Sequence, residues 1–158
     1  MRATWSEHLS VGNGEIDLDH KFLFGLIDGV VHAIEANDCL ALSRAFELLE
    51  NKLRSHFSNV ERIAETVKFP FTRHKEAQIF LLKELENLKD ELQGKAGVWC
   101  EAAVKHYSDI LRGLLMDHIT DKDMLMKPLL QNYPYDLTVA GLCRDSMQSN
   151  YIEAHHGR

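Results

Sequence analysis

Apolar residues recur at steps of three and four along most of this chain, which is the spacing of one face of an α-helix. Four segments carry this pattern, each of them about 20 to 30 residues long and bounded by turn signals. They run from Asp17 to about Ala36, from about Cys39 to Val67, from Thr72 to Gly94, and from about Gly97 or Val98 to about Leu125. The sequence therefore predicts an all-α protein.

Breaks in the pattern separate the four segments. Asn37 and Asp38 form a turn, and Pro70 ends the second helix because proline disfavours helical backbone in the residue before it. Thr72 offers a side chain that can cap the third helix, and Gly94 ends it. Helices of this length joined by short turns are expected to pack as an up-down-up-down antiparallel four-helix bundle.

Both ends of the chain lie outside these helices. An N-terminal arm precedes the first helix, and a segment containing Pro128 and Pro134 follows the fourth. We expect residues 1–126 to form the bundle and residues 127–158 to form an extension packed on or beside it. An amphipathic stretch from Asp136 to Ile152 predicts an accessory helix in this extension.

Composition fits one helical domain and excludes several partners. The 158 residues are 45% hydrophobic, which is ample for one core. A net charge of −6 and a pI near 5.8 argue against a nucleic-acid face or a basic membrane-surface helix. The N-terminus lacks the apolar region of a signal peptide, and no apolar stretch approaches the roughly 20 residues that span a bilayer. We therefore expect a cytoplasmic protein.

The cysteines indicate neither a disulfide framework nor a thiolate zinc site. Cys39, Cys100 and Cys143 are odd in number, far apart and without a Cys-x-x-Cys pair. We expect reduced and mostly buried thiols.

Four of the nine histidines continue the apolar stripes, one on each predicted helix: His20, His56, His74 and His118. In an up-down-up-down bundle, the start of helix one, the end of two, the start of three and the end of four meet at one end. We therefore expect these four side chains to point inward near one another. The heights match only loosely, because His56 lies about ten residues inside its helix end.

Several buried imidazoles in one place favour a metal site. A single core histidine is usually satisfied by a nearby carbonyl or carboxylate, but four together with a carboxylate are costly to desolvate unless a cation binds them. Asp123 follows His118 by five residues and supplies such a carboxylate. Nitrogen and carboxylate ligands suit iron, manganese or zinc. The remaining histidines are expected to be solvated.

The motifs around these residues resemble the hemerythrin and bacteriohemerythrin family from about Trp5 to Met126. Trp5, Val11-Gly12 and the run Ile-Asp-Leu-Asp-His-Lys-Phe-Leu-Phe match the family's opening, His56-Phe57 its second-helix motif, and His-Ile-Thr-Asp-Lys-Asp its closing motif. The resemblance implies that His20, His56, His74, His118 and Asp123 are iron ligands, with Asp123 bridging two irons. It also implies that Trp5 and Ile119 line the pocket of a diatomic ligand, beside Val60.

The chain departs from the family pattern at two ligand positions. Val60 stands where the family has a bridging glutamate, and Gln78 stands where it has a second third-helix histidine. Glu61 is adjacent to the first of these, but one residue turns a helix by about 100°, so Glu61 reaches the site only through a π-bulge or a register slip. Gln78 offers its amide oxygen as a weak ligand, or a hydrogen bond to a bound water.

These features lead to one expected function and two alternatives. The first is a non-enzymatic, non-haem metal protein that binds dioxygen or a similar diatomic at a modified di-iron site, for carriage, delivery or sensing. The alternative is a hemerythrin-fold regulatory or interaction module whose altered site holds one metal ion, zinc or nothing, with no protein partner identifiable. A di-iron oxidase or peroxidase is less favoured, because the chain lacks Glu-x-x-His repeats on two helices.

Overall fold

The computed structural model describes residues 4–141, and these residues form four long helices. The long helices are α1 (Gly14–Glu35), α2 (Cys39–Thr66), α3 (Thr72–Gly94) and α4 (Glu101–Asp121). Three short helices complete the described part: η1 (Glu7–Leu9), η2 (Asp123–Met126) and α5 (Lys127–Leu130). The predicted all-α four-helix bundle is confirmed. Most of the predicted accessory helix from Asp136 to Ile152, and Cys143, lie outside the described residues.

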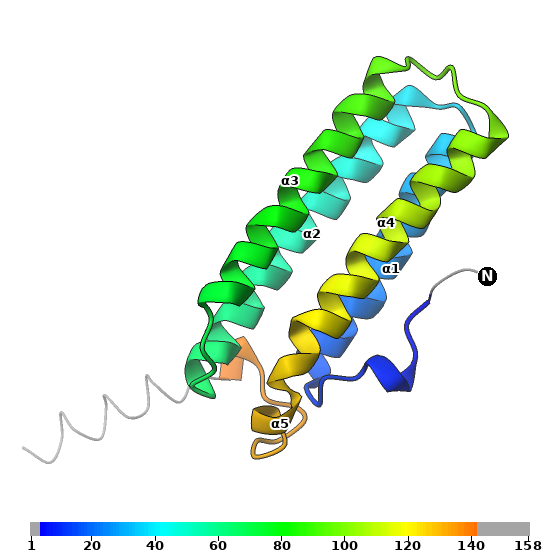
Figure 1. Ribbon diagram of the computed structural model, residues 1–158. Helices are drawn as coiled ribbons and strands as arrows, with labels where there is room; N and C mark the ends of the chain where they lie inside the picture. Colours follow the sequence, from blue (N-terminus) through cyan, green and yellow to red (C-terminus); the bar gives the residue numbers. More distant parts are fainter. Residues whose placement is uncertain (1–3, 142–158) are drawn as a thin grey trace, which may run out of the picture.

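The four long helices stand side by side along one axis (Figure 1). The α1–α2 turn and the α3–α4 connection lie at one end of the bundle, and the α2–α3 loop lies at the other end with the start of α1 (Figure 1). Helix α1 contacts α2 and α4, and α3 contacts the same two helices. None of the helices in the described part is apolar over a length that would cross a bilayer.

The apolar stripes of the four helices meet in one main core. Its most completely buried members come from all four helices and include Leu23, Ile34, Phe46, Leu49, Leu92 and Leu111. Burial of each such side chain stabilises the fold by about 1.5–3 kcal/mol. The three- and four-residue rhythm of the sequence is thus explained by packing around a shared axis.

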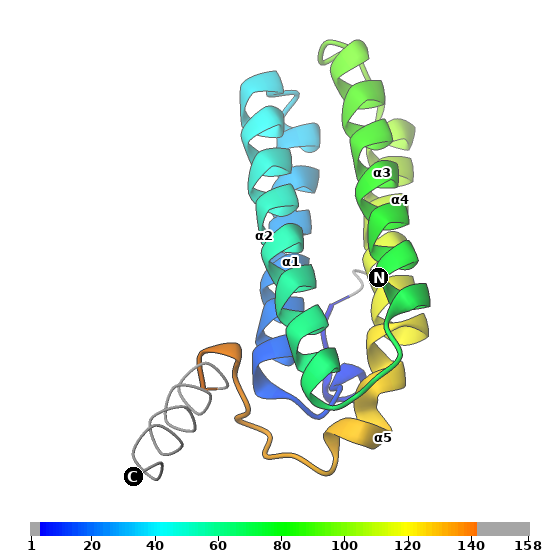
Figure 2. The ribbon, with the colours of Figure 1, turned by 90° about the vertical axis from the view of Figure 1, so that its left-hand side faces the viewer.

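A second apolar cluster closes one end of the bundle. His56 lies ten residues before Thr66, so α2 extends well past the histidines. The side chains on this last part of α2 pack against the N-terminal arm and the chain after α4; the buried members are Val11, Ile16, Val60, Ile63, Ala64, Val67, Met126, Leu130 and Val139. The loose match in height expected for His56 therefore reflects the ten residues by which α2 continues past it, at the end of the bundle where α5 and the start of α1 also lie (Figure 2).

Hydrogen bonds fasten the segment after α5 to the start of α1. The Asp17 carboxylate accepts from the Val11 backbone N–H and from the Tyr135 hydroxyl, both at 2.9 Å. The Asn13 side chain donates to the Leu137 carbonyl at 2.9 Å, and the Gly14 N–H donates to the Tyr135 carbonyl at 2.7 Å. This segment therefore packs against the end of the bundle at which α1 begins.

The helix ends differ from the predictions in detail. Helix α1 begins earlier, at Gly14, because the Asn13 side chain caps it by accepting from the Ile16 N–H at 3.0 Å. Helix α4 begins later than predicted, at Glu101, because Gly97 has a φ of +80° that a helix does not allow. The α-helix then ends at Asp121 rather than near Leu125, and residues Asp123–Met126 form a 3-10 turn.

The predicted capping role of Thr72 is wrong. Thr72 is the first residue of α3, and Phe71 occupies the N-cap position without a side-chain hydrogen bond. The Phe71 ring instead stacks on His74, with ring centroids 4.9 Å apart and planes 16° from parallel. Aromatic packing thus takes the place of a polar cap.

The prediction of buried thiols is also wrong for the two described cysteines. Cys39 and Cys100 are free and exposed. Cys39 is the first residue of α2 and Cys100 is the N-cap of α4, so both lie at helix starts at one end of the bundle and outside its main core.

Candidate metal centre

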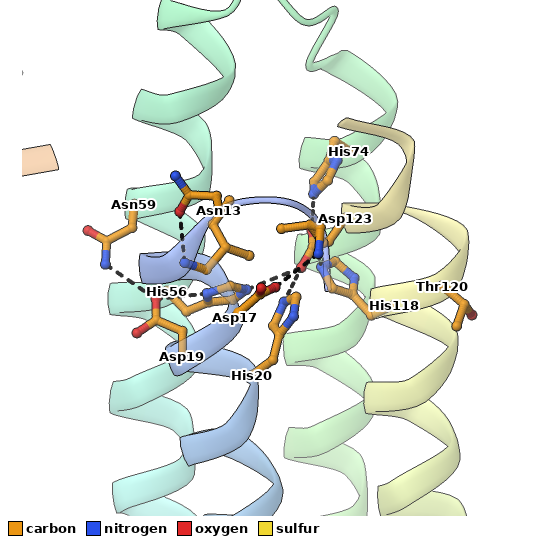
Figure 3. Close-up of polar contacts among 12 residues, drawn as sticks. Asn13, Asp17, Asp19, His20, His56, Asn59, His74, His118, Thr120 and Asp123 are labelled. Carbon is orange, nitrogen blue, oxygen red and sulfur yellow. Dashed lines mark hydrogen bonds and ion pairs between the residues drawn. The ribbon is translucent and has the colours of Figure 1, made fainter. Parts of the chain in front are cut away.

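Four histidine rings, one from each long helix, surround the carboxylate of Asp123 (Figure 3). Oδ2 of Asp123 lies 2.7 Å from Nε2 of His20 and 3.2 Å from Nε2 of His56. Oδ1 lies 2.6 Å from Nε2 of His74 and 3.5 Å from Nε2 of His118. Each carboxylate oxygen therefore faces one pair of histidines.

The geometry fits two metal ions that share Asp123. Two groups of ligand atoms each lie within 4.8 Å of one another, namely His20, His56 and Asp123, and His74, His118 and Asp123. Ligands about 2.1 Å from one ion and at right angles to each other lie about 3 Å apart, which is near the observed separations. Nε2 of His118 is buried without a hydrogen-bond partner. A cation would satisfy this nitrogen.

The burial of these five side chains would cost free energy if no cation were bound among them. The exposed fraction is 0% for His20, 1% for His56, 3% for His74, 6% for His118 and 1% for Asp123. Polar groups withdrawn from water to this degree need strong partners. Nδ1 of His20, Nδ1 of His74 and Nε2 of His118 have no hydrogen-bond partner, and a set of buried imidazoles around one carboxylate matches a metal-binding role.

The end of α4 explains how Asp123 enters the site. Five residues along an α-helix rotate the side chain by about 140°, so on a continuous helix Asp123 would point away from His118. The helix ends at Asp121, and Lys122 leaves the helical region with φ −124° and ψ −68°. This turn brings Asp123 back under the four rings.

Asp19 supports the site from outside, and the sequence reasoning missed it. Its Oδ2 lies 3.0 Å from Nδ1 of His56, while Lys52 donates to Oδ1 at 2.7 Å and Asn59 donates to Oδ2 at 3.4 Å. A carboxylate on the outer nitrogen of a ligand histidine fixes the ring and directs the other nitrogen to the metal. Asp19 is one residue from the apolar stripe, and its partners lie on another helix, so periodicity gave no signal.

The charges in the metal-free site are strongly coupled. Burial raises the pKa of the Asp123 carboxyl, but hydrogen bonds from His20, His56 and His74 and the nearby His118 ring outweigh it and hold the pKa well below its usual range. Burial lowers the pKa of His56, yet hydrogen bonds to Asp123 and Asp19 raise it to about 9. Burial keeps the pKa of His20 below its ordinary value. Without metal, His56 therefore carries a proton between two carboxylates.

Both altered ligand positions are buried, whereas Glu61 is not part of the site. Val60 is fully buried in the second apolar cluster. Gln78 is buried as well, and its side-chain nitrogen has no hydrogen-bond partner. Helix α2 continues through Glu61 without a π-bulge, so this carboxylate stays half-exposed and pairs with Lys75 at 2.9 Å.

The residues expected around a diatomic ligand lie in different clusters. Ile119 is fully buried in the main core, next in sequence to His118, and Trp5 is half-buried against the same core. The Lys21 ammonium lies 4.2 Å from the centre of the Trp5 ring. Val60 belongs to the second cluster. The ring of Phe57, which lies 5.2 Å from that of His118, adds to the apolar surroundings of the site.

Comparison with known proteins points to one family. No family profile matches the chain. Bacteriohemerythrins of Pseudomonas aeruginosa strains LESB58 and UCBPP-PA14 are each 24% identical over 133 residues, which cover 75% of this chain and 87% of theirs. The bacteriohemerythrin of Pseudomonas paraeruginosa strain DSM 24068 / PA7 gives the same values. The resemblance indicated by the motifs is therefore confirmed: this chain is similar to bacteriohemerythrins, and its buried histidine and aspartate groups could hold metal ions.

Proposed function

We propose that this protein holds two iron ions and binds dioxygen or a similar diatomic ligand, for carriage, delivery or sensing rather than for catalysis. The observation that supports this most strongly is the division of the Asp123 carboxylate, whose two oxygens face separate histidine pairs. Such a carboxylate is suited to link two ions. The matched relatives are named bacteriohemerythrins, which agrees with iron.

The site has two halves, the His20–His56 half and the His74–His118 half, which share Asp123, and the ligand atoms of each half favour iron. Two histidines and one carboxylate on one side of an ion are typical of non-haem iron(II) sites and leave other positions free. Iron, when bound, supplies those free positions to a diatomic ligand. The residues of the chain hold and orient the donors, and the surrounding apolar side chains of Phe57, Val60 and Ile119 exclude water.

The site carries less negative charge than the family pattern provides. Two divalent ions bring four positive charges, Asp123 offsets one of them, and Asp19 acts only from behind His56. With Val60 in place of a bridging glutamate, we expect a small anion such as hydroxide to complete the site. Anion binding should accordingly be part of its chemistry.

Anaerobic reconstitution with iron(II) tests the proposal. Protein without an affinity tag should take up close to two irons per chain and develop near-ultraviolet absorption when air is admitted. A colourless preparation that retains less than one iron per chain would contradict it. His32→Ala serves as a control, because His32 is exposed and is not on the apolar stripe of α1.

A regulatory module with one metal ion, zinc or none is a second candidate. It is favoured by the two altered ligand positions and by the hydrogen bonds that fasten residues 135–139 to the start of α1, near His20. Leu130 and Val139 belong to the second apolar cluster, so a truncation should begin after Gly141. If this candidate holds, that truncation changes partner binding and leaves the metal content unchanged. A cytoplasmic location stays a prediction from the sequence.

A further inference from the structure

The four histidine rings differ in whether Nδ1, the nitrogen that faces away from Asp123, has a hydrogen-bond partner. Among the described residues, His56 is the ring whose Nδ1 contacts a carboxylate, that of Asp19. Asp19 is itself fixed by Lys52 and Asn59. Loss of such an outer partner typically costs a metal site 10- to 100-fold in affinity. The His20–His56 half of the centre is therefore braced by a hydrogen-bond network.

The other half is held mainly by packing. Nδ1 of His74 has no hydrogen-bond partner, and its ring is positioned by stacking on Phe71. Nε2 of His118 lies 3.5 Å from Asp123, the longest of the four separations, and makes no hydrogen bond. Nδ1 of His20 is likewise unpaired, so the two halves differ in their second ring, His56 against His118.

Surface pockets reach this second half. A pocket of about 490 Å³ between the α2–α3 loop and the end of α4 is lined by Phe69, Leu125 and His74. A smaller one of about 170 Å³ between α3 and α4 is lined by Phe80 and His118. A ligand or a departing ion thus has short routes to His74 and His118, whereas neither His20 nor His56 lines these pockets.

Gln78 adds an unused hydrogen-bond donor on the same side. It follows His74 by one helical turn, so the two side chains share a face of α3. Its exposed fraction is 3%, its amide nitrogen has no acceptor, and it lines a pocket of about 360 Å³ beside Phe57. A buried unpaired N–H is unfavourable, and an oxygen or nitrogen acceptor arriving in the site would remove that penalty.

From these differences we propose that the two halves have separate roles, an inference that rests on the proposed function. The His20–His56 half retains its ion, while the His74–His118 half exchanges its ion and receives the exogenous ligand. The Gln78 amide donates a hydrogen bond to that ligand. This difference in roles follows from the Asp19 contact that fixes His56 in the first half, and from the pockets and the unpaired Gln78 amide in the second half.

Release of cobalt(II) to a chelator tests the division of roles. Protein loaded with two cobalt ions should lose one quickly and one slowly. His74→Ala and His118→Ala should each leave a single, slowly released ion. Asp19→Asn should accelerate the slow phase about 10- to 100-fold. Asp28→Asn is the matched control on α1, because Asp28 pairs with Arg112 rather than with a ring of the centre.

The outcomes separate the inference from the proposed function. Two cobalt ions released in one phase, or an Asp19→Asn variant in which the fast phase accelerates instead, overturn the inference and leave the two-metal proposal intact. Uptake of less than one cobalt ion per chain overturns both.

Azide binding to the oxidised iron protein tests the role of Gln78. In Gln78→Leu loaded with two irons, the azide affinity, followed by the azide-to-iron absorption, should fall about tenfold relative to the parent protein at the same iron content, since one hydrogen bond is lost. Gln93→Leu, an exposed position on the same helix, is the control. Unchanged azide affinity in Gln78→Leu, or an equal loss in both variants, contradicts the assigned role.

Discussion

Asp19 on α1 holds the outer nitrogen of His56 on α2 at 3.0 Å, while the inner nitrogen of the same ring faces Asp123 at 3.2 Å. A single imidazole therefore lies between two carboxylates in a buried position. This arrangement ties the protonation of the metal-free protein to the loading of the site, and it leads to the first two predictions.

Metal affinity should rise with pH up to about pH 9. The pKa of His56 is raised to about 9 in the metal-free protein, so below that pH the ion must displace a proton from the ring. One proton in competition lowers the apparent affinity by about tenfold for each pH unit below the pKa. Isothermal titration with zinc in buffers of different ionisation enthalpy measures both the slope and the proton release. Binding that is independent of pH between 6 and 9 would contradict this account.

The stability of the metal-free protein should depend on pH through the same pair. The folded pKa of His56 is above its ordinary value of 6.5, so its stabilisation is fully present below pH 6.5 and is lost as the pH rises through about 9. Hydrogen bonds from His56 and Lys52 outweigh burial and lower the pKa of Asp19 to about 2, so that contribution is present above pH 3.8 and is lost as the pH falls through about 2. Urea unfolding of the metal-free protein should therefore show a decrease in stability from pH 6.5 to 9. In Asp19→Asn this decrease should be smaller.

Removal of the shared carboxylate should abolish loading of both halves. Asp123→Ala is expected to hold no tightly bound metal, because both ligand groups contain Asp123. His118→Ala should lose tight binding in its own half, and His32→Ala should bind as the parent protein does. Metal content after gel filtration distinguishes these results. Two retained ions in Asp123→Ala would show that the carboxylate is not shared.

Restoration of the two altered ligands should strengthen the iron site. Val60→Glu combined with Gln78→His adds a carboxylate and an imidazole at buried positions and should raise iron content and strengthen reversible dioxygen binding. Without metal, Val60→Glu alone should destabilise the fold, because a carboxylate would then be buried in an apolar cluster. Thermal unfolding with and without iron(II) measures this difference. No gain in iron retention by the double variant would mean that other features limit the site.

The second apolar cluster should contribute both stability and retention of metal. Leu130→Ala removes a side chain that is 1% exposed, and such truncations cost roughly 2–5 kcal/mol. It should also speed metal loss, because Leu130 packs next to Met126 in the turn that carries Asp123. Leu48→Ala, at an exposed position of α2, is the control. Equal stabilities of the two variants would exclude this role for the cluster.

The helices and the four histidines were predictable because burial in a bundle imposes a three- and four-residue rhythm. His20, His56, His74 and His118 all fall on that rhythm, so their inward direction followed from the sequence. Asp123 does not fall on that rhythm, and its predicted bridging role depended on the resemblance to a family. Its position in the structure depends on the end of α4, which periodicity does not indicate.

The parts that were not predictable depend on contacts between distant residues. Asp19 supports His56 across two helices, and Val139 helps to cover the end of α2 from the other end of the chain. No local sequence pattern indicates such contacts between distant residues. The start of α3 is a smaller case, in which the stacking of Phe71 on His74 replaced the expected Thr72 cap.

The most direct test of the central claim is to locate the metal in crystals of iron-loaded protein by anomalous diffraction at the iron edge. We expect two peaks of similar height on either side of the Asp123 carboxylate, one beside His20 and His56 and the other beside His74 and His118. A single peak, or peaks away from Asp123, would contradict the account of two ions bound to one shared carboxylate.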